Sequence, residues 1–332
     1  MPILVLLIVG TILIVMGQHN VPYQKNNGFV FGTVYNIIYQ CDSDLHNSIK
    51  AELQKVDFAL SPFNEESVIS AVNRGEESIN SADTMFTYVF NLAMTISEET
   101  DGAFDITVAP LVNAWGFGTA EGIFPLEQQV DSLKALTGYK KIKGPKLPEG
   151  MKLDCSSIAK GYACDVVATM LRTYGVENYM IEIGGEIVSS GVSEKRVPWR
   201  IGVERPTDDS LSMHTANHTI LNITDMAMAT SGNYRNFYYR DGKKYAHTID
   251  PRTGYPVQHN ILSSTVIAHD CATADAYATA FMVLGLDEAK AVLERHPELM
   301  AYFIYDDEHS DTTTTSAYKV WLSDGLNEKM IK

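Results

Sequence analysis

The spacing of apolar and polar residues predicts both helices and strands along this chain. Leu45, Ile49 and Leu53 recur at helical spacing, which predicts an amphipathic helix over 44–58. Similar spacing predicts further helices over 82–99, 126–137, 157–174, 274–284 and 287–295. Short β-branched and aromatic runs predict strands over 29–39, 179–183, 186–190, 199–204, 218–224, 236–240, 262–268, 299–305 and 317–322. Because these elements mix without strict strand–helix–strand alternation, we expect an α+β domain rather than a doubly wound parallel sheet.

The first residues form a separate apolar segment. Residues 3–16 (ILVLLIVGTILIVM) are apolar apart from Thr11. This run is shorter than the roughly twenty residues that a membrane span needs, but it suits the core of a signal peptide. No Lys or Arg precedes it, Gln18 stands where a Cys would complete a lipoprotein signal, and a buried strand is the alternative. We expect residues 1–17 to be a signal peptide or membrane anchor, and the protein to be extracytoplasmic, exported or attached to the membrane through residues 3–16.

Charge and composition narrow the class of ligand. The 332 residues are 45% hydrophobic and 20% charged, which is ordinary for a globular protein. The 26 basic and 41 acidic residues give a net charge of −15, so we expect no nucleic-acid partner. A phosphate ester bound by so acidic a chain would need a metal ion or helix N-termini to neutralise its charge.

Several common motifs are missing from the sequence. It contains no Walker loop, no GxGxxG dinucleotide fingerprint and no GxSxG nucleophile elbow, so the corresponding nucleotide-binding folds and hydrolases are disfavoured. None of the four cysteines forms a CxxC pair or a zinc-like spacing with histidine. We expect them to be small buried hydrophobic residues, although an exported protein could also form disulfides.

The segment Thr100–Gly118 (TDGAFDITVAPLVNAWGFG) combines a carboxylate with aromatic rings. Asp105 follows Phe104, and Trp115 and Phe117 lie on either side of a glycine. Rings of this kind stack on a heteroaromatic ligand while a carboxylate fixes its polar edge. The alternative is a loop capped by Asp105 with Trp115 in the core.

The segment Leu153–Asp165 (LDCSSIAKGYACD) has the pattern of a helix start. Ser156 or Ser157 could cap the helix, which places Lys160 and Gly161 in its first turn. A phosphate there would meet free N–H groups and one cation. The alternative is a capped amphipathic helix with a solvated lysine.

Two further segments carry polar groups that could act in catalysis. His247 and Asp250 precede a Pro-Arg-Thr-Gly turn, and a histidine near a carboxylate is a candidate general base. Asp275 and Thr279 are four residues apart, so they share one helix face and together suit a hard cation such as Mg²⁺. The alternatives are a core histidine, and an aspartate at a helix start with a threonine bonded to its own helix.

Read in order, the polar segments resemble the ApbE family, the FAD:protein FMN transferases. The resemblance covers residues 28–332, which we therefore interpret as a single large ApbE-like domain. Phe31-Gly32-Thr33 is similar to the family's opening Met-Gly-Thr, and Ser61-Pro62-Phe63-Asn64 with Ser67 and Asn73 to its next motif. The closer matches are GAFDITVAPLVNAWGFG, LDCSSIAKGYACD, IEIGGEIVSSG, ATSGNYR, HTIDPRTGYP and ADAYATA.

The resemblance implies a Mg²⁺-dependent enzyme that moves FMN from FAD to a threonine hydroxyl of a target protein and releases AMP. The target would carry a [DN]GxxTGAT-like motif. The family's metal ligands correspond to Ser157, Asp275 and Thr279, and His247 is the candidate base. The resemblance also implies an FAD site formed by Phe31, Phe63, Ala103, Phe104, Asp105, Asp154, Lys160 and Ile249.

Some positions depart from the family pattern. Phe31 replaces the usual Met, Phe63 lacks the hydroxyl of the Tyr found in some members, and Ala278 stands where some relatives have a second Asp ligand. One anionic ligand fewer should weaken Mg²⁺ binding or leave more of the coordination to backbone carbonyls and water. Two alternative functions stay open: a Mg²⁺-dependent FAD pyrophosphatase that gives FMN and AMP, and a non-catalytic flavin-binding protein.

Overall fold

The computed structural model describes residues 21–119, 124–204, 217–233, 237–240, 243–258, 260–306 and 318–330. The apolar segment expected at residues 1–17 lies outside these ranges. Within them, no helix has both the length and the apolar character needed to cross a bilayer.

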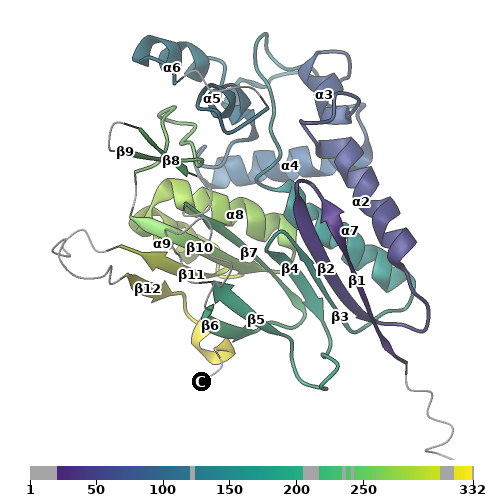
Figure 1. The fold of residues 1–332 in the computed structure, drawn as a ribbon. Coiled ribbons are helices and arrows are strands. Elements are labelled where there is room, and N and C mark those ends of the chain that lie inside the picture. Colours follow the sequence, from purple (N-terminus) through teal and green to yellow (C-terminus); the bar gives the residue numbers. More distant parts are fainter. Residues whose placement is uncertain are drawn as a thin grey trace, which may run out of the picture.

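An antiparallel sheet of eight strands forms the centre of the domain (Figure 1). Its strand order is β1–β2–β3–β4–β7–β10–β11–β12, and every neighbouring pair is antiparallel. The strands are β1 (Tyr23–Val30), β2 (Thr33–Gln40), β3 (Tyr179–Ile183), β4 (Glu186–Ser190), β7 (Met226–Gly232), β10 (Ile261–Ala268), β11 (Met300–Tyr305) and β12 (Lys319–Leu322). This architecture confirms the expected α+β class.

Helices cover one face of the sheet (Figure 1). They include α2 (His46–Leu60), α4 (Thr84–Glu99), α7 (Ala159–Thr173), α8 (Cys271–Leu284) and α9 (Leu286–Arg295). Helix α8 packs against β7, β10 and α7, and nearly all of its residues are buried, as expected for a helix that is apolar on all sides. It is the central element of the main core.

The opposite face of the sheet carries a smaller core. The hairpin of β5 (Arg200–Glu204) and β6 (Asn217–Asn222) packs there around the buried side chains of Trp199 and Leu221. The short helix η3 (Leu326–Lys329) adds Leu326 to the same cluster.

A third, smaller cluster forms around Trp115. The short elements near it are η1 (Ile106–Val108), α5 (Ala109–Ala114), α6 (Glu127–Lys134) and the hairpin of β8 (Phe237–Arg240) and β9 (Lys243–Ala246). Leu111, Val130 and Ile249 pack with Trp115, which brings segments from three parts of the chain together. The remaining short elements are α3 (Val68–Asn73) and η2 (Tyr139–Lys141).

The structure corrects several sequence-based boundaries. The strand expected over 29–39 is a hairpin that turns at Phe31 (φ 52°) and Gly32 (φ 73°), because a two-residue turn of this hand needs positive φ at both positions. The stretch Met226–Gly232 is β7, a strand inside the sheet that the sequence pattern did not predict, because Thr230 and Ser231 interrupt the apolar run. Helix α8 begins at Cys271 rather than 274, because Asp270 caps it by accepting a hydrogen bond from Thr273 N at 2.9 Å.

All four cysteines are free thiols. Cys155, Cys164 and Cys271 are fully buried in the main core, and Cys41 is half-buried. This confirms the expectation that they act as small hydrophobic residues.

Candidate active site

A cavity of about 700 Å³ opens between the main sheet, the start of α7 and the Trp115 region. This volume is within the range typical of ligand sites, roughly 300–1,000 Å³. Eleven of the twelve residues singled out from the sequence line it: Phe63, Ala103, Phe104, Asp105, Asp154, Ser157, Lys160, His247, Ile249, Asp275 and Thr279. The exception is Phe31, which packs half-buried against the main core at the β1–β2 turn.

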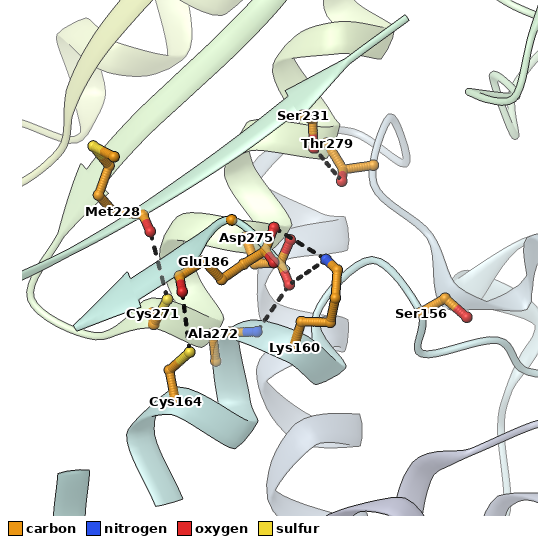
Figure 2. A network of polar contacts seen from close by, with 12 residues as sticks. Ser156, Lys160, Cys164, Glu186, Met228, Ser231, Cys271, Ala272, Asp275 and Thr279 are labelled. Carbon is orange, nitrogen blue, oxygen red and sulfur yellow. Dashed lines mark hydrogen bonds and ion pairs between the residues drawn. The ribbon is translucent and has the colours of Figure 1, made fainter. Parts of the chain in front are cut away.

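An ionic cluster of one lysine and two carboxylates forms the centre of the site (Figure 2). Lys160 Nζ lies 3.0 Å from Glu186 Oε1 and 3.8 Å from Asp275 Oδ2. Both carboxylates are buried, with residue exposures of 2% for Glu186 and 3% for Asp275. Lys160 is therefore paired rather than solvated.

Burial and neighbouring charges shift the pKa values of Lys160 and Glu186 in opposite directions. Burial by itself lowers the pKa of Lys160, but the charges of Asp275 and Glu186 outweigh it and raise the pKa above its usual value. Burial raises the pKa of Glu186, and the Lys160 ammonium opposes that rise. Two carboxylates against one ammonium leave the site with excess negative charge when all three groups are ionised.

Close packing of two helices brings the cluster together. A Cβ atom built on Gly161 would lie 2.2 Å from the backbone oxygen of Cys271, so only glycine lets α7 approach α8 this closely. At this contact Gly161 N donates a hydrogen bond to Asp275 Oδ2 at 3.0 Å. The expectation that a phosphate would meet free N–H groups in this turn is therefore wrong at Gly161, whose N–H is already bound.

Neither serine before α7 serves as its cap. The helix begins after Ile158, which makes no side-chain capping bond. Ser156 instead donates from N (2.8 Å) and Oγ (2.5 Å) to Asp154 Oδ1. This leaves Asp154, Ser156 and Ser157 together on the cavity wall.

Two hydroxyl groups extend the site beyond the ionic cluster. Thr279 Oγ1 lies 3.1 Å from Ser231 Oγ of β7, and both residues line the cavity (Figure 2). Thr279 is thus bonded across to the sheet, not to its own helix. One turn of α8 separates it from Asp275, so both oxygen donors face the cavity.

These residues fit a hard divalent cation. Glu186 Oε2 is buried and has no hydrogen-bond partner, which leaves an oxygen in the site unsatisfied. Within the described ranges, no cluster of three His, Cys, Asp or Glu side chains is placed to hold a metal ion. A cation here would therefore depend on Asp275, on hydroxyl or backbone oxygens, and on water and substrate phosphates, which is how Mg²⁺ is commonly bound.

The aromatic side of the cavity contains both structural and exposed groups. Asp105 caps η1 by accepting hydrogen bonds from Thr107 N (2.9 Å) and Thr107 Oγ1 (2.7 Å), and its second oxygen accepts from Tyr139 N at 2.7 Å. Trp115 is buried and donates to Gly254 O at 2.9 Å, so it is a core residue. Phe63 is 69% exposed at the cavity mouth, where its ring is free to stack on a ligand.

His247 also lines the cavity. It is half-buried, and Phe117 contacts it edge-on with the ring centroids 6.3 Å apart. Asp250 forms an ion pair with Arg252, whose Nε is 3.1 Å away.

Comparison with known proteins identifies the family. The model of the ApbE family matches residues 31–303. The chain belongs to the ApbE family. An FAD:protein FMN transferase of Vibrio cholerae is 37% identical over 311 residues, covering 90% of this chain and 92% of the relative. A protein of the same name from Haemophilus influenzae is 35% identical, covering 94% of this chain and 97% of the relative.

Solved ApbE structures share the fold. The flavin transferase ApbE of Vibrio cholerae aligns with a TM-score of 0.81 at 34% identity, covering 93% of this chain and 99% of that one. The apo flavinyl transferase ApbE of Pseudomonas stutzeri aligns with a TM-score of 0.79 at 31% identity, covering 93% and 96%. These likenesses confirm the sequence-based assignment to the ApbE family of enzymes.

The sequence did not single out Glu186 as a site residue. Its position directly after Gly184-Gly185 was visible within a family-like block, IEIGGEIVSSG. Nothing in that block indicates that the Glu186 side chain is buried in the cavity and forms an ion pair with Lys160 of α7. The roles of the other residues that line this ApbE cavity stay predictions.

Proposed function

We propose that this protein transfers FMN from FAD to a threonine hydroxyl of a target protein in a Mg²⁺-dependent reaction and releases AMP. The observation that carries the proposal is that Lys160, Asp275 and Thr279 line the same cavity. The exposed ring of Phe63 also lines it. A lysine and a cation site together suit a pyrophosphate. The names of the relatives supply the flavin chemistry.

The reaction is a displacement at phosphorus. The threonine oxygen attacks the phosphorus that carries the riboflavin moiety, a new P–O bond forms, and the pyrophosphate P–O bond breaks. The bridging oxygen leaves with AMP, and the threonine proton passes to a base. Phosphoryl transfers of this kind depend mainly on positioning and charge neutralisation.

We assign the residues on this basis. Lys160 binds the pyrophosphate as a fixed cation. Asp275 and Thr279, with an oxygen from Ser157, would hold the Mg²⁺ ion, which supplies electrophilic activation and neutralises phosphate charge. His247 accepts the threonine proton, since it lines the same cavity and an imidazole ring can act as a general base.

The remaining predicted residues would bind the rest of FAD. Phe63 stacks on a ring at the mouth, and Ala103, Phe104, Asp105, Asp154 and Ile249 form the adjoining wall. Both oxygens of the Asp105 carboxylate already accept hydrogen bonds from backbone or hydroxyl donors. Its contribution to FAD binding is therefore to fix the shape of this wall.

We also propose that the reaction takes place outside the cytoplasm. The support is the apolar run at residues 3–16. Fractionation of cells that produce the full chain, compared with a variant lacking residues 2–17, tests this. The full chain should be found in the membrane or exported fraction and the shortened chain in the cytoplasm.

The decisive experiment is incubation of the full chain with FAD, Mg²⁺ and a small acceptor domain carrying a [DN]GxxTGAT-like motif, followed by mass spectrometry of the acceptor. A gain of one FMN that needs Mg²⁺ and disappears with a Thr→Ala acceptor supports the proposal. Free FMN and AMP with an unmodified acceptor would instead indicate a pyrophosphatase. Intact FAD that stays bound would indicate a flavin-binding protein without turnover.

A further inference from the structure

Glu186 is an unusual residue at the centre of the cavity. It begins β4 and is almost completely buried, with Oε1 paired to Lys160 at 3.0 Å. Its other oxygen, Oε2, is also buried but has no hydrogen-bond partner. Leaving a buried carboxylate oxygen unsatisfied is costly, so stability alone does not explain this residue.

Lys160 lies at unequal distances from its two carboxylates. The ammonium nitrogen is 0.8 Å closer to Glu186 Oε1, at 3.0 Å, than to Asp275 Oδ2, at 3.8 Å. The same Asp275 Oδ2 also accepts a hydrogen bond from Gly161 N at 3.0 Å. Glu186 is therefore the nearer, hydrogen-bonded counter-ion of the lysine, and Asp275 forms a longer ion pair with it.

Removing the charge of Glu186 would change this balance. A half-buried ammonium that loses its nearer counter-ion is attracted more strongly to the remaining buried carboxylate, because opposite charges interact strongly where water is partly excluded. The Lys160 ammonium would then pair more closely with the Asp275 carboxylate and compete with a divalent cation for it. The pairing with Glu186 prevents that competition.

We propose that Glu186 is a positioning residue that holds the Lys160 ammonium away from Asp275 and so keeps the Asp275 carboxylate available to a divalent cation. This inference rests on the cation site of the proposed function. It assigns Glu186 a role through Lys160, which the double variant below distinguishes from direct contact of the unpaired Oε2 with the ion. It also gives the two carboxylates separate partners: the lysine for Glu186, and the cation for Asp275.

Mn²⁺ binding to the full chain tests the proposal. Electron paramagnetic resonance counts free Mn²⁺, and the titration needs neither FAD nor an acceptor. We expect Glu186→Gln to weaken Mn²⁺ binding about tenfold or more, as is typical when a residue supporting a metal ligand is lost. Lys160→Met should strengthen binding, because it removes the competing cation.

The double variant separates action through Lys160 from direct action on the ion. In the Lys160→Met background, Glu186→Gln should change the affinity less than about threefold, since the residue through which it acts is gone. Lys160→Gln provides a second background, and thermal unfolding of every variant shows which ones are folded.

Three results would overturn the proposal. An equal loss of affinity in both backgrounds would mean that Glu186 acts on the ion directly, and no loss in the wild-type background would mean that it has no such role. Absence of Mn²⁺ binding by the wild-type protein would also refute it. Because FMN transfer is not part of the measurement, these outcomes are independent of whether the acceptor is modified.

Discussion

Gly161 N donates a hydrogen bond to Asp275 Oδ2 at 3.0 Å, although 114 positions separate the two residues in the sequence. This bond joins α7 to α8 at a point where the two helices pack closely. Lys160 precedes Gly161, and Thr279 lies one turn beyond Asp275. The same contact therefore sets the distance between the lysine and the oxygen donors of the cavity.

A methyl group at Gly161 should separate the two helices. Gly161→Ala would place Cβ 2.2 Å from the Cys271 backbone oxygen and 2.8 Å from Asp275 Cβ, and backbone atoms cannot move away cheaply. We expect a loss of about 1–3 kcal/mol in unfolding free energy, the usual cost of overpacking, together with reduced FMN transfer. Urea unfolding measures the first effect.

Gly144→Ala is the matched control for that change. No atom lies within 4 Å of a Cβ at Gly144, and its φ is not in the positive range that disfavours other residues. The variant should keep wild-type stability to within about 0.5 kcal/mol, as surface substitutions usually do. Equal stability of the two alanine variants would contradict the close-packing argument.

Removing the negative charge of Asp275 should abolish Mg²⁺-dependent turnover and leave the fold intact. In Asp275→Asn the amide oxygen can still accept the hydrogen bond from Gly161, but the side chain is a much weaker ligand for a hard cation. Turnover measured over a Mg²⁺ series checks this, with circular dichroism to confirm folding. Unchanged turnover at limiting Mg²⁺ would remove Asp275 from the metal site.

His247→Ala should slow FMN transfer far more than it weakens FAD binding. A general base typically contributes a factor of about 10²–10⁴ to the rate. We therefore expect a loss in that range in single-turnover transfer, with FAD affinity within about threefold of wild type. If the rate and the affinity fall by the same factor, His247 is a binding residue.

The stability of the fold should depend on pH through Asp165. This carboxylate accepts hydrogen bonds from Cys271 N and Ala272 N at the start of α8, but burial outweighs them and raises its pKa to about 7. A raised pKa means that the folded state holds the proton more tightly than the unfolded chain. Its contribution to stability is therefore complete below about pH 4 and is lost as the pH rises to about 7.

Asp165→Asn tests the pH dependence directly. The uncharged amide removes this proton linkage, so the difference in stability between pH 5 and pH 8 should be smaller than in the wild-type protein. Urea unfolding at the two pH values gives both differences. A variant that loses as much stability as the wild type over this interval would show that Asp165 is not the group responsible.

Sequence alone predicted many of the regular elements and the family. Strands β3 and β4 begin and end where the apolar runs predicted, because runs of five residues bounded by glycine and polar residues have clear limits. The β1–β2 turn was not predicted because Phe31 adopts a positive φ, which is uncommon for a residue with a bulky side chain. Such a turn is stabilised by pairing of the two strands, which local sequence does not encode.

Eleven of the twelve residues that the sequence singled out line the cavity, because family-like blocks contain them, but Glu186 was not among the twelve. The sequence did not determine how they are connected. The pairing of Lys160 with Glu186 and the bond between Gly161 and Asp275 join elements that are far apart in the chain. The tertiary packing of α7 against β4 and α8 sets the Lys160–Glu186 and Gly161–Asp275 distances. Local sequence does not set them, because the partners lie on elements that only the folded chain brings into contact.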